Sequence, residues 1–114
     1  MPVPKPRIAA RLVAPTHTPR VGVRWPYSVH VATLGGRPLR ATITVQIVDP
    51  VGGTHPVQFR NTKRDIVRLP FVGTYRDWVT WPPRSALGIA LRLRATVHTA
   101  RGSAVLTYPV VPHR

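Results

Sequence analysis

The chain has 114 residues, of which 43% are hydrophobic, and carries a formal net charge of +14. Its length fits one domain that buries roughly two-thirds of its unfolded surface, enough for a core without metal or disulfide staples. The absence of cysteine excludes disulfides and thiolate metal sites, and no apolar stretch approaches the roughly 18 residues of a membrane-spanning helix.

The charge comes from seventeen Lys and Arg residues, fifteen of them Arg, against three acidic residues, Asp49, Asp65 and Asp77. A field of that size attracts polyanions such as nucleic acid, anionic lipid or an anionic wall polymer. The arginines are spread along the chain without a basic run. Two interpretations follow: a dedicated polyanion partner, or diffuse surface charge that reflects a GC-rich genome.

Proline alternates through residues 1–6, which predicts an extended tail before a single domain at 7–112. This opening has prolines where a signal peptide would carry its apolar segment. Strand-like alternation then recurs between turn sequences such as "LGGRP", "DPVGG" and "ARGS". The predicted strands are 7–13, 24–32, 39–48, 54–59, a brief one over 65–69, 73–81, 89–99 and 104–111.

Three of these segments divide clearly into an apolar and a polar face. Pro56 lacks a backbone donor and places 54–59 at a sheet edge. Seven or eight short strands, with no convincing helical stripe, predict an all-β sandwich of two antiparallel sheets. The expected core-facing residues are Trp25, Tyr27, Val29, Val31, Ala41, Ile43, Val45, Ile47, Leu91, Leu93, Ala95 and Val97.

The order of "RWPYSVHV", "GRPLRATITVQI", "FVGTYRDWVTWPPRSALG" and "LRLRATVHTARGSAVLTYPVVP" resembles immunoglobulin-like and fibronectin type III-like sandwiches. It is most similar to small domains of secreted or surface proteins of actinobacteria, over about residues 7–112. The resemblance implies an immunoglobulin-like sandwich and a role in binding, spacing or assembly, with no active site. It also favours an extracellular or cell-surface location over a cytoplasmic one. The cysteine pair of antibody-type domains is absent, so packing alone must hold the core.

Catalytic and metal-binding patterns are missing from the sequence. None of the serines lies in a G-x-S-x-G elbow, the three aspartates are isolated, and the five histidines lack metal-ligand spacing. We therefore expect no enzymatic activity, no metal and no cofactor.

The resemblance places the strands 39–48 and 89–99 side by side. Arg40 and its outward neighbours would then share an exposed face with Arg92 and Arg94, and Arg37 and Arg101 would flank it at the turns. Arginine forks on such a Thr-lined face can hold phosphates or carboxylates. The alternative is that Arg and Thr are routine solubilising residues on a wet strand face.

The run "FVGTYRDWVTWP" (71–82) holds four aromatic residues. Strand periodicity assigns Tyr75 and Trp81 to the core, with Phe71 packing at the strand entrance. Trp78 is then exposed beside Arg76, where it could stack on a sugar, a base or a partner side chain, or be covered by residues 82–87. Asp77 shares the core phase, so we expect it to cap a turn, pair with an Arg or lie at a bulge.

Together these features predict a non-enzymatic binding or assembly module. It would dock on a protein or anionic partner through the basic sheet face, or through a free edge at the first or last strand. One alternative is an intracellular basic β-barrel that binds nucleic acid, which predicts aromatic side chains among the arginines of a concave sheet face. Another is a subunit of a larger particle or envelope complex.

Overall fold

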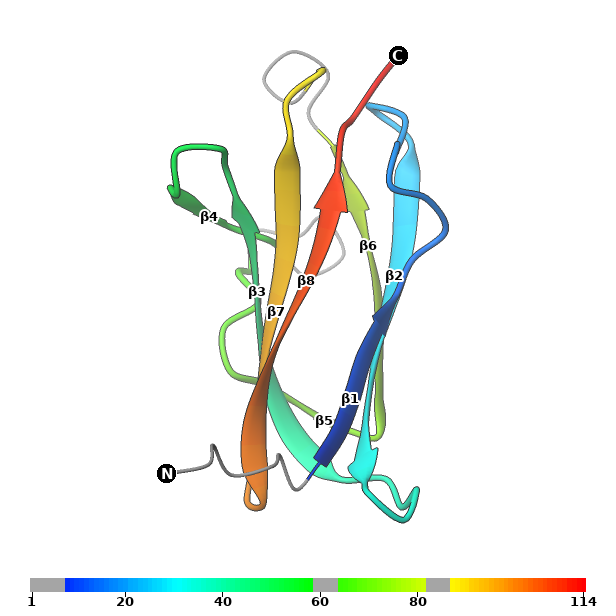
Figure 1. Ribbon diagram of the computed structural model, residues 1–114, viewed down its shortest axis with the longest axis vertical. Helices are drawn as coiled ribbons and strands as arrows, with labels where there is room; N and C mark the ends of the chain where they lie inside the picture. The colour runs from blue at the N-terminus through cyan, green and yellow to red at the C-terminus, as the bar shows by residue number, and fades with distance from the viewer. Residues whose placement is uncertain (1–7, 59–63, 82–86) are drawn as a thin grey trace, which may run out of the picture.

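The computed structural model describes residues 8–58, 64–81 and 87–114, and these ranges contain eight β-strands (Figure 1). The predicted tail at 1–6 lies outside the described residues. The strands are β1 (Ile8–Val13), β2 (Arg24–Thr33), β3 (Arg40–Val48), β4 (Thr54–Pro56), β5 (Leu69–Val72), β6 (Thr74–Thr80), β7 (Leu91–Thr99) and β8 (Gly102–Val110).

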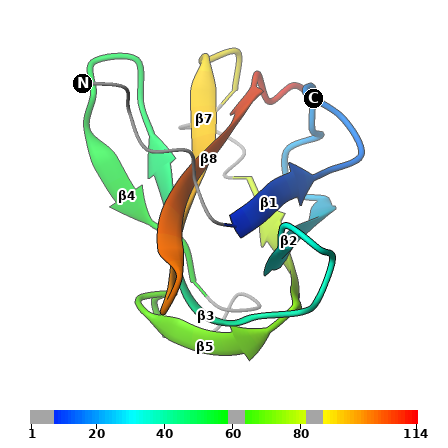
Figure 2. The same cartoon turned by 60° about the horizontal axis from the view of Figure 1, so that its bottom comes forward.

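The strands form two antiparallel sheets that face each other (Figures 1 and 2). One sheet has the order β1-β2-β6. The other has the order β4-β3-β7-β8, with β5 also paired to β3. The predicted all-β sandwich is confirmed, and so is the adjacency of β3 and β7, in which Thr42 lies opposite His98 and Thr44 opposite Thr96. The short strand β4 lies at a sheet edge, as Pro56 predicts.

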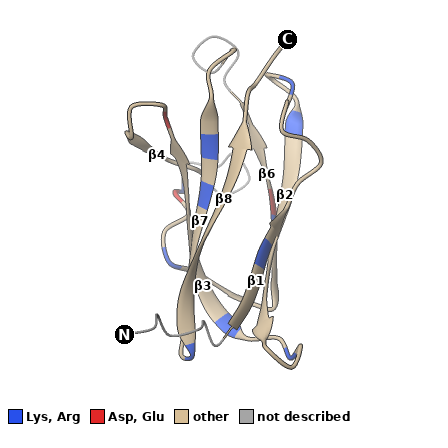
Figure 3. Ribbon diagram, in the orientation of Figure 1, with Lys and Arg blue, Asp and Glu red and all other residues tan. Residues whose placement is uncertain are grey.

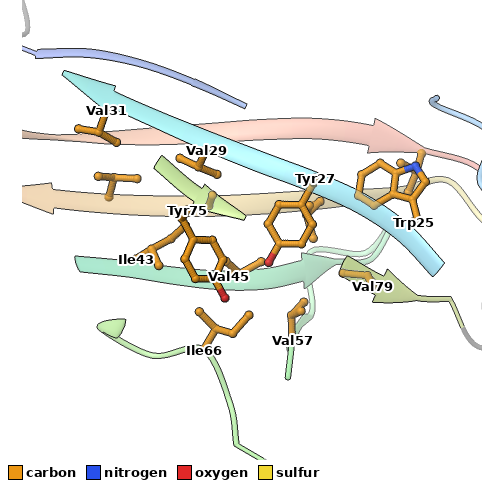
Figure 4. Close-up of a cluster of buried hydrophobic side chains, with 14 of the residues drawn as sticks. Trp25, Tyr27, Val29, Val31, Ile43, Val45, Val57, Ile66, Tyr75 and Val79 are labelled. Carbon is orange, nitrogen blue, oxygen red and sulfur yellow. The ribbon is translucent and has the colours of Figure 1, made fainter. Parts of the chain in front are cut away.

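The space between the sheets is filled by the alternate residues of β2, β3, β6 and β7 (Figure 4). Each residue predicted to face the core on these strands is buried, except Ile47, which is half-buried. Trp81 is fully buried and its ring meets that of Trp25 edge-on at 5.5 Å. Aromatic packing therefore closes the core at the end where β2 begins, with no disulfide needed.

The F-x-G-x-Y-x-D run forms the corner where the chain passes from β5 in one sheet to β6 in the other. Gly73 sits at the corner with φ 71°, and a Cβ there would lie 2.9 Å from Cβ of Pro38. The rings of Phe71 and Tyr75, on either side of the corner, pack edge-on at 5.8 Å. Tyr75 and Phe71 thus serve packing, as predicted from periodicity.

The expected strand at 65–69 is wrong. The strand β5 begins only at Leu69, because Arg68 has a φ of 51° and turns the chain at that point. Ile66 is buried instead as a single anchor, accepting a hydrogen bond from Val45 N at 3.1 Å and donating to Val57 O at 2.9 Å. This segment fills the stretch of the β3 edge between the parts that pair with β5 and with β4.

The chain after β1 leaves its own sheet and joins the other one. His17 O accepts a hydrogen bond from Val111 N at 2.8 Å, and Pro19 O accepts one from His113 N at 3.0 Å. The ring of His17 stacks on Tyr108 at 4.1 Å. These contacts add a parallel partner to the chain beyond the end of β8 and tie the two sheets together along one side.

Candidate functional site

The first candidate surface is the β3–β7–β8 face, defined as the outward positions of these three strands. In cross-strand register, Arg92 lies between Val48 and Pro109, and Arg94 lies between Gln46 and Thr107. The face consists of Arg40, Thr42, Thr44, Gln46 and Val48 of β3, Arg92, Arg94, Thr96 and His98 of β7, and Ser103, Val105, Thr107 and Pro109 of β8.

The two arginines of β7 are held differently. Arg94 is half-buried, and its Nη2 donates a 2.7 Å hydrogen bond to Oε1 of Gln46, which orients the guanidinium along the face. Arg92 is exposed and also lines a groove of about 380 Å³ with His17 and Pro109. One cation is therefore positioned by the neighbouring strand, and the other is accessible to a ligand at the border of a groove.

Other groups on this face are already engaged. Thr44 Oγ1 accepts a hydrogen bond from the backbone N–H of Arg68 at 3.1 Å. His98 Nδ1 lies 2.8 Å from Oγ of Ser103. The polar centre of the face is thus ordered by its own hydrogen bonds, and the arginines supply its charge.

None of the three acidic residues occupies an outward position of β3, β7 or β8. Asp49 follows β3 in a tight turn, where its Oδ1 accepts hydrogen bonds from the N–H groups of Val51 and Gly53. His55 Nε2, 3.0 Å from Oδ2, and these N–H groups hold the pKa of Asp49 below its usual value. Asp65 is bridged to Gln58 beyond β4. The field of the face is therefore uncompensated by carboxylates within it.

Arg37 and Arg101 lie at one end of the sandwich. Arg37 is exposed in the β2–β3 turn, where its carbonyl accepts a hydrogen bond from Thr33 N at 2.8 Å. Arg101 is exposed in the β7–β8 turn, and its backbone N–H donates to Oγ1 of Thr99 at 3.1 Å. Arg40 begins β3 at this same end, so the three cations lie at one end of the molecule, with Arg37 tied to the end of β2.

The remaining predicted residues, Arg76 and Trp78, lie on the opposite side of the molecule. They belong to the β1–β2–β6 face, the outward positions of the other sheet. Trp78 is half-buried, which agrees with the partial cover that the sequence left open, and the Arg24 guanidinium carbon lies 4.5 Å from its ring centroid. The predicted cover from 82–87 falls mostly outside the described residues. The face consists of Ala9, Arg11 and Val13 of β1, Arg24, Pro26, Ser28, His30 and Ala32 of β2, and Thr74, Arg76, Trp78 and Thr80 of β6.

Sequence reasoning missed Arg11 and Arg24 as candidates. Both occupy the outward phase of their strands, and that phase is visible in the alternation of residues 7–13 and 24–32. Their gathering depends on the pairing of β2 with both β1 and β6. In that register His30 lies between Arg11 and Thr74, and partial burial together with the positive charges of Arg11 and Arg76 lowers the pKa of His30.

Asp77 is buried in the core, 5% exposed. Tyr75 Oη donates a 2.6 Å hydrogen bond to Oδ2, and the backbone N–H of Trp78 donates a 2.7 Å hydrogen bond to Oδ1. A tyrosine hydroxyl and a backbone N–H thus supply donors to the carboxylate. The β2–β6 register runs without interruption, so the expected bulge is absent from this ladder. Burial, followed by the charge of Asp77, raises the pKa of the Tyr27 phenol across the ladder.

Among the residues that the structure describes, no three His, Cys, Asp or Glu side chains gather as a potential metal site. The same residues contain no helix long and apolar enough to cross a membrane.

Comparison with known proteins supports the architecture and goes no further. No protein-family model matches the chain, and no curated protein matches it. The fold is similar to that of the human F-spondin reeler domain, with a TM-score of 0.61 and 10% sequence identity over 91% of this chain and 89% of that chain. At this identity the likeness establishes a shared β-sandwich fold.

Proposed function

We propose that the chain is a non-enzymatic binding module that docks on an anionic polymer through the β3–β7–β8 face. The observation that carries the proposal is the presence of Arg40, Arg92 and Arg94 at outward positions of strands that carry no outward carboxylate. Uncompensated charge on one sheet face attracts a polyanion and releases its counterions on contact.

The arrangement of the arginines suits sulfate, phosphate or carboxylate groups. A guanidinium presents two parallel N–H donors to such oxyanions, which adds geometric selectivity to the charge. The contact of Arg94 with Gln46 restricts the rotamers of one fork before binding, so less side-chain entropy is lost when a ligand arrives.

The outward positions of β3, β7 and β8, all of them described, hold no aromatic side chain. Proteins that bind single-stranded nucleic acid stack bases on aromatic side chains set among cations. This difference disfavours single-stranded nucleic acid as the polymer on this face, and an anionic polysaccharide is the polymer that we propose.

The docking surface is better supported as a sheet face than as an edge strand. The β1 and β8 edges lie beside each other, and Tyr108 Oη donates a 3.4 Å hydrogen bond to Ala14 O just after β1 (Figure 1). The pairing of His17 with Val111 covers the chain beyond the end of β8. These contacts reduce the backbone available for adding a partner strand.

We further infer that the sandwich is of the immunoglobulin-like or fibronectin type III-like kind, and that it works outside the cell or at its surface. The strand orders β1-β2-β6 and β4-β3-β7-β8 correspond to A-B-E and C′-C-F-G in immunoglobulin lettering. The parallel contact of Arg20 with His113, after the chain has changed sheets, also supports this kind of sandwich.

The test is the salt dependence of binding to heparin, a sulfated polysaccharide, for the wild type and for Arg92→Ser/Arg94→Ser. Loss of two contacts lowers the slope of log K against log salt by about 2. The control Arg20→Ser/Arg114→Ser removes the same charge at exposed positions that do not belong to the face and leaves the slope close to that of the wild type. An unchanged slope in Arg92→Ser/Arg94→Ser eliminates this face, and tighter binding of DNA than of heparin favours the nucleic-acid alternative.

A further inference from the structure

We propose that the chain bridges two segments of anionic polysaccharide, with the β1–β2–β6 face as a second binding surface. The inference rests on the proposed function, because it assigns the first segment to the β3–β7–β8 face. Figure 3 shows that arginines occur on strands of both sheets, and not on one sheet alone.

The second face gathers its cations through strand pairing. Arg76 lies opposite Ser28 of β2, and Ser28 lies opposite Val13 of β1. Arg11 lies opposite His30, which is the next outward residue of β2 after Ser28. These pairs place Arg11 and Arg76 on neighbouring rows of the face, and both side chains are exposed.

The charge of the second face is uncompensated, like that of the first. Asp77, the acidic residue of β6, points into the core and accepts its hydrogen bond from Tyr75 there. The outward positions of β1, β2 and β6 therefore carry Arg11, Arg24 and Arg76 and no carboxylate. The first face likewise has three arginines at outward strand positions, Arg40, Arg92 and Arg94.

The two faces are separated enough to act independently. Packed sheets lie about 10 Å apart, and the outward side chains add to that separation. The Debye length at physiological salt is about 8 Å, so two polymer segments on opposite faces repel each other weakly. A straight segment that lies along one face does not reach the other. Binding at both faces therefore joins two segments.

The second face also contains an aromatic side chain, which the first does not. Trp78 lies beneath Arg24, and its cross-strand neighbour is Pro26. Displacement of Arg24 by a ligand on this face would therefore change the environment of Trp78.

The experiment compares Arg11→Ser/Arg76→Ser with the wild type using two lengths of heparin. With long heparin the wild type forms cross-linked complexes that scatter light. In Arg11→Ser/Arg76→Ser the scattered intensity falls about tenfold, because cross-linking requires a binding site on each face. With a heparin octasaccharide, too short to span two molecules, the affinity of the first site stays within about twofold of wild type, since distant sites behave additively.

Three outcomes overturn the proposal. Scattering by Arg11→Ser/Arg76→Ser equal to wild type shows that the second face is not used, and leaves the proposed function standing. An equal loss in Arg20→Ser/Arg114→Ser shows that net charge alone drives cross-linking. A loss of octasaccharide affinity as large as that in Arg92→Ser/Arg94→Ser shows one shared site. Failure of the wild type to bind heparin contradicts the proposed function itself, so the two failures are distinguishable. Arg11→Gln/Arg76→Gln, which keeps longer side chains over the sheet, repeats the comparison if the Ser variant unfolds.

Discussion

The hydroxyl of Tyr75 donates a 2.6 Å hydrogen bond to Asp77, two residues further along the same strand and on the same inward face. This contact explains how a carboxylate is held in the core of a sandwich otherwise filled with apolar and aromatic side chains. A buried carboxylate without partners would be strongly unfavourable. The hydroxyl and the backbone N–H of Trp78 supply donors to its two oxygens.

Tyr75→Phe is therefore expected to destabilise the fold by about 2–3 kcal/mol, because it removes a hydrogen bond to a charged buried group. Urea unfolding followed by circular dichroism measures the change. Tyr108→Phe is a matched control that removes only a 3.4 Å contact with Ala14 O and should cost less than about 1 kcal/mol. Equal effects of the two substitutions would contradict a stabilising role for the Tyr75–Asp77 contact.

The fold should lose stability in alkaline solution. Burial raises the pKa of Tyr27 and of Tyr75, with the Asp77 charge adding to the effect at Tyr27 and the hydrogen bond to Asp77 adding to it at Tyr75. Both phenols stay neutral in the folded state. In the unfolded chain they ionise above the ordinary tyrosine pKa of about 10. The unfolded state then releases protons, so the stabilising contribution is complete below about pH 10 and falls as the pH rises.

Phenolate absorbance of Tyr27 and Tyr75 should consequently appear together with loss of circular dichroism. Tyr27→Phe removes one of these titrations and should make the decline of the unfolding free energy with pH shallower. Ionisation of Tyr27 near pH 10 in a chain with an intact dichroism spectrum is the contrary result.

Gly73→Ala is expected to be more damaging than Gly22→Ala, although both glycines have nearly the same φ, 71° and 74°. Each substitution costs about 1–2 kcal/mol for a left-handed backbone with a Cβ. At Gly73 the new Cβ also lies 2.9 Å from Cβ of Pro38, whereas at Gly22 nothing lies within 4 Å. This crowding adds about 1–3 kcal/mol. Thermal unfolding of both variants measures the difference, and similar losses would show that the corner relaxes.

His30 reports the charge of the second face. Partial burial and the positive charges of Arg11 and Arg76 lower its pKa below the ordinary value. Arg76→Gln should raise that pKa, because one of the charges that oppose protonation is gone. Arg92→Gln, on the other sheet, should leave it unchanged. Ring-proton NMR titration distinguishes the two variants, and an equal response to both would assign the shift to a general field.

The same residue predicts how binding to the second face depends on pH. A bound polyanion favours the protonated imidazole and raises its pKa. His30 therefore takes up a proton on binding at pH values between its pKa in the free protein, which lies below the ordinary value, and its pKa in the complex. Affinity at this face should therefore increase as the pH falls through that range. The measurement is octasaccharide titration of Arg92→Ser/Arg94→Ser, in which the first face is weakened, at several pH values. A pH-independent affinity would place the ligand away from His30.

The strands themselves could be predicted from sequence because alternation is a local property of an extended chain. Alternation within each strand is enough to predict that Tyr27 of β2, Ile43 of β3 and Leu93 of β7 face the core. No knowledge of the neighbouring strands is needed. The same reasoning failed at 65–69, where Ile66 is anchored by Val45 and Val57, residues distant in sequence, and where Arg68 takes a left-handed conformation.

By itself, the sequence determined the fold class, the excess of arginine and the strand phase on which most candidate arginines lie. Only the tertiary structure decided which of them share a surface. Arg92 and Arg76 have the same outward phase but lie on opposite sheets, and Arg24 covers Trp78 because β2 pairs with β6. The tertiary structure also decided that Asp77 accepts hydrogen bonds from the Tyr75 hydroxyl and the Trp78 N–H. Strand pairing and the orientation of buried side chains depend on contacts between residues far apart in the chain, and a period-two pattern contains no record of those contacts.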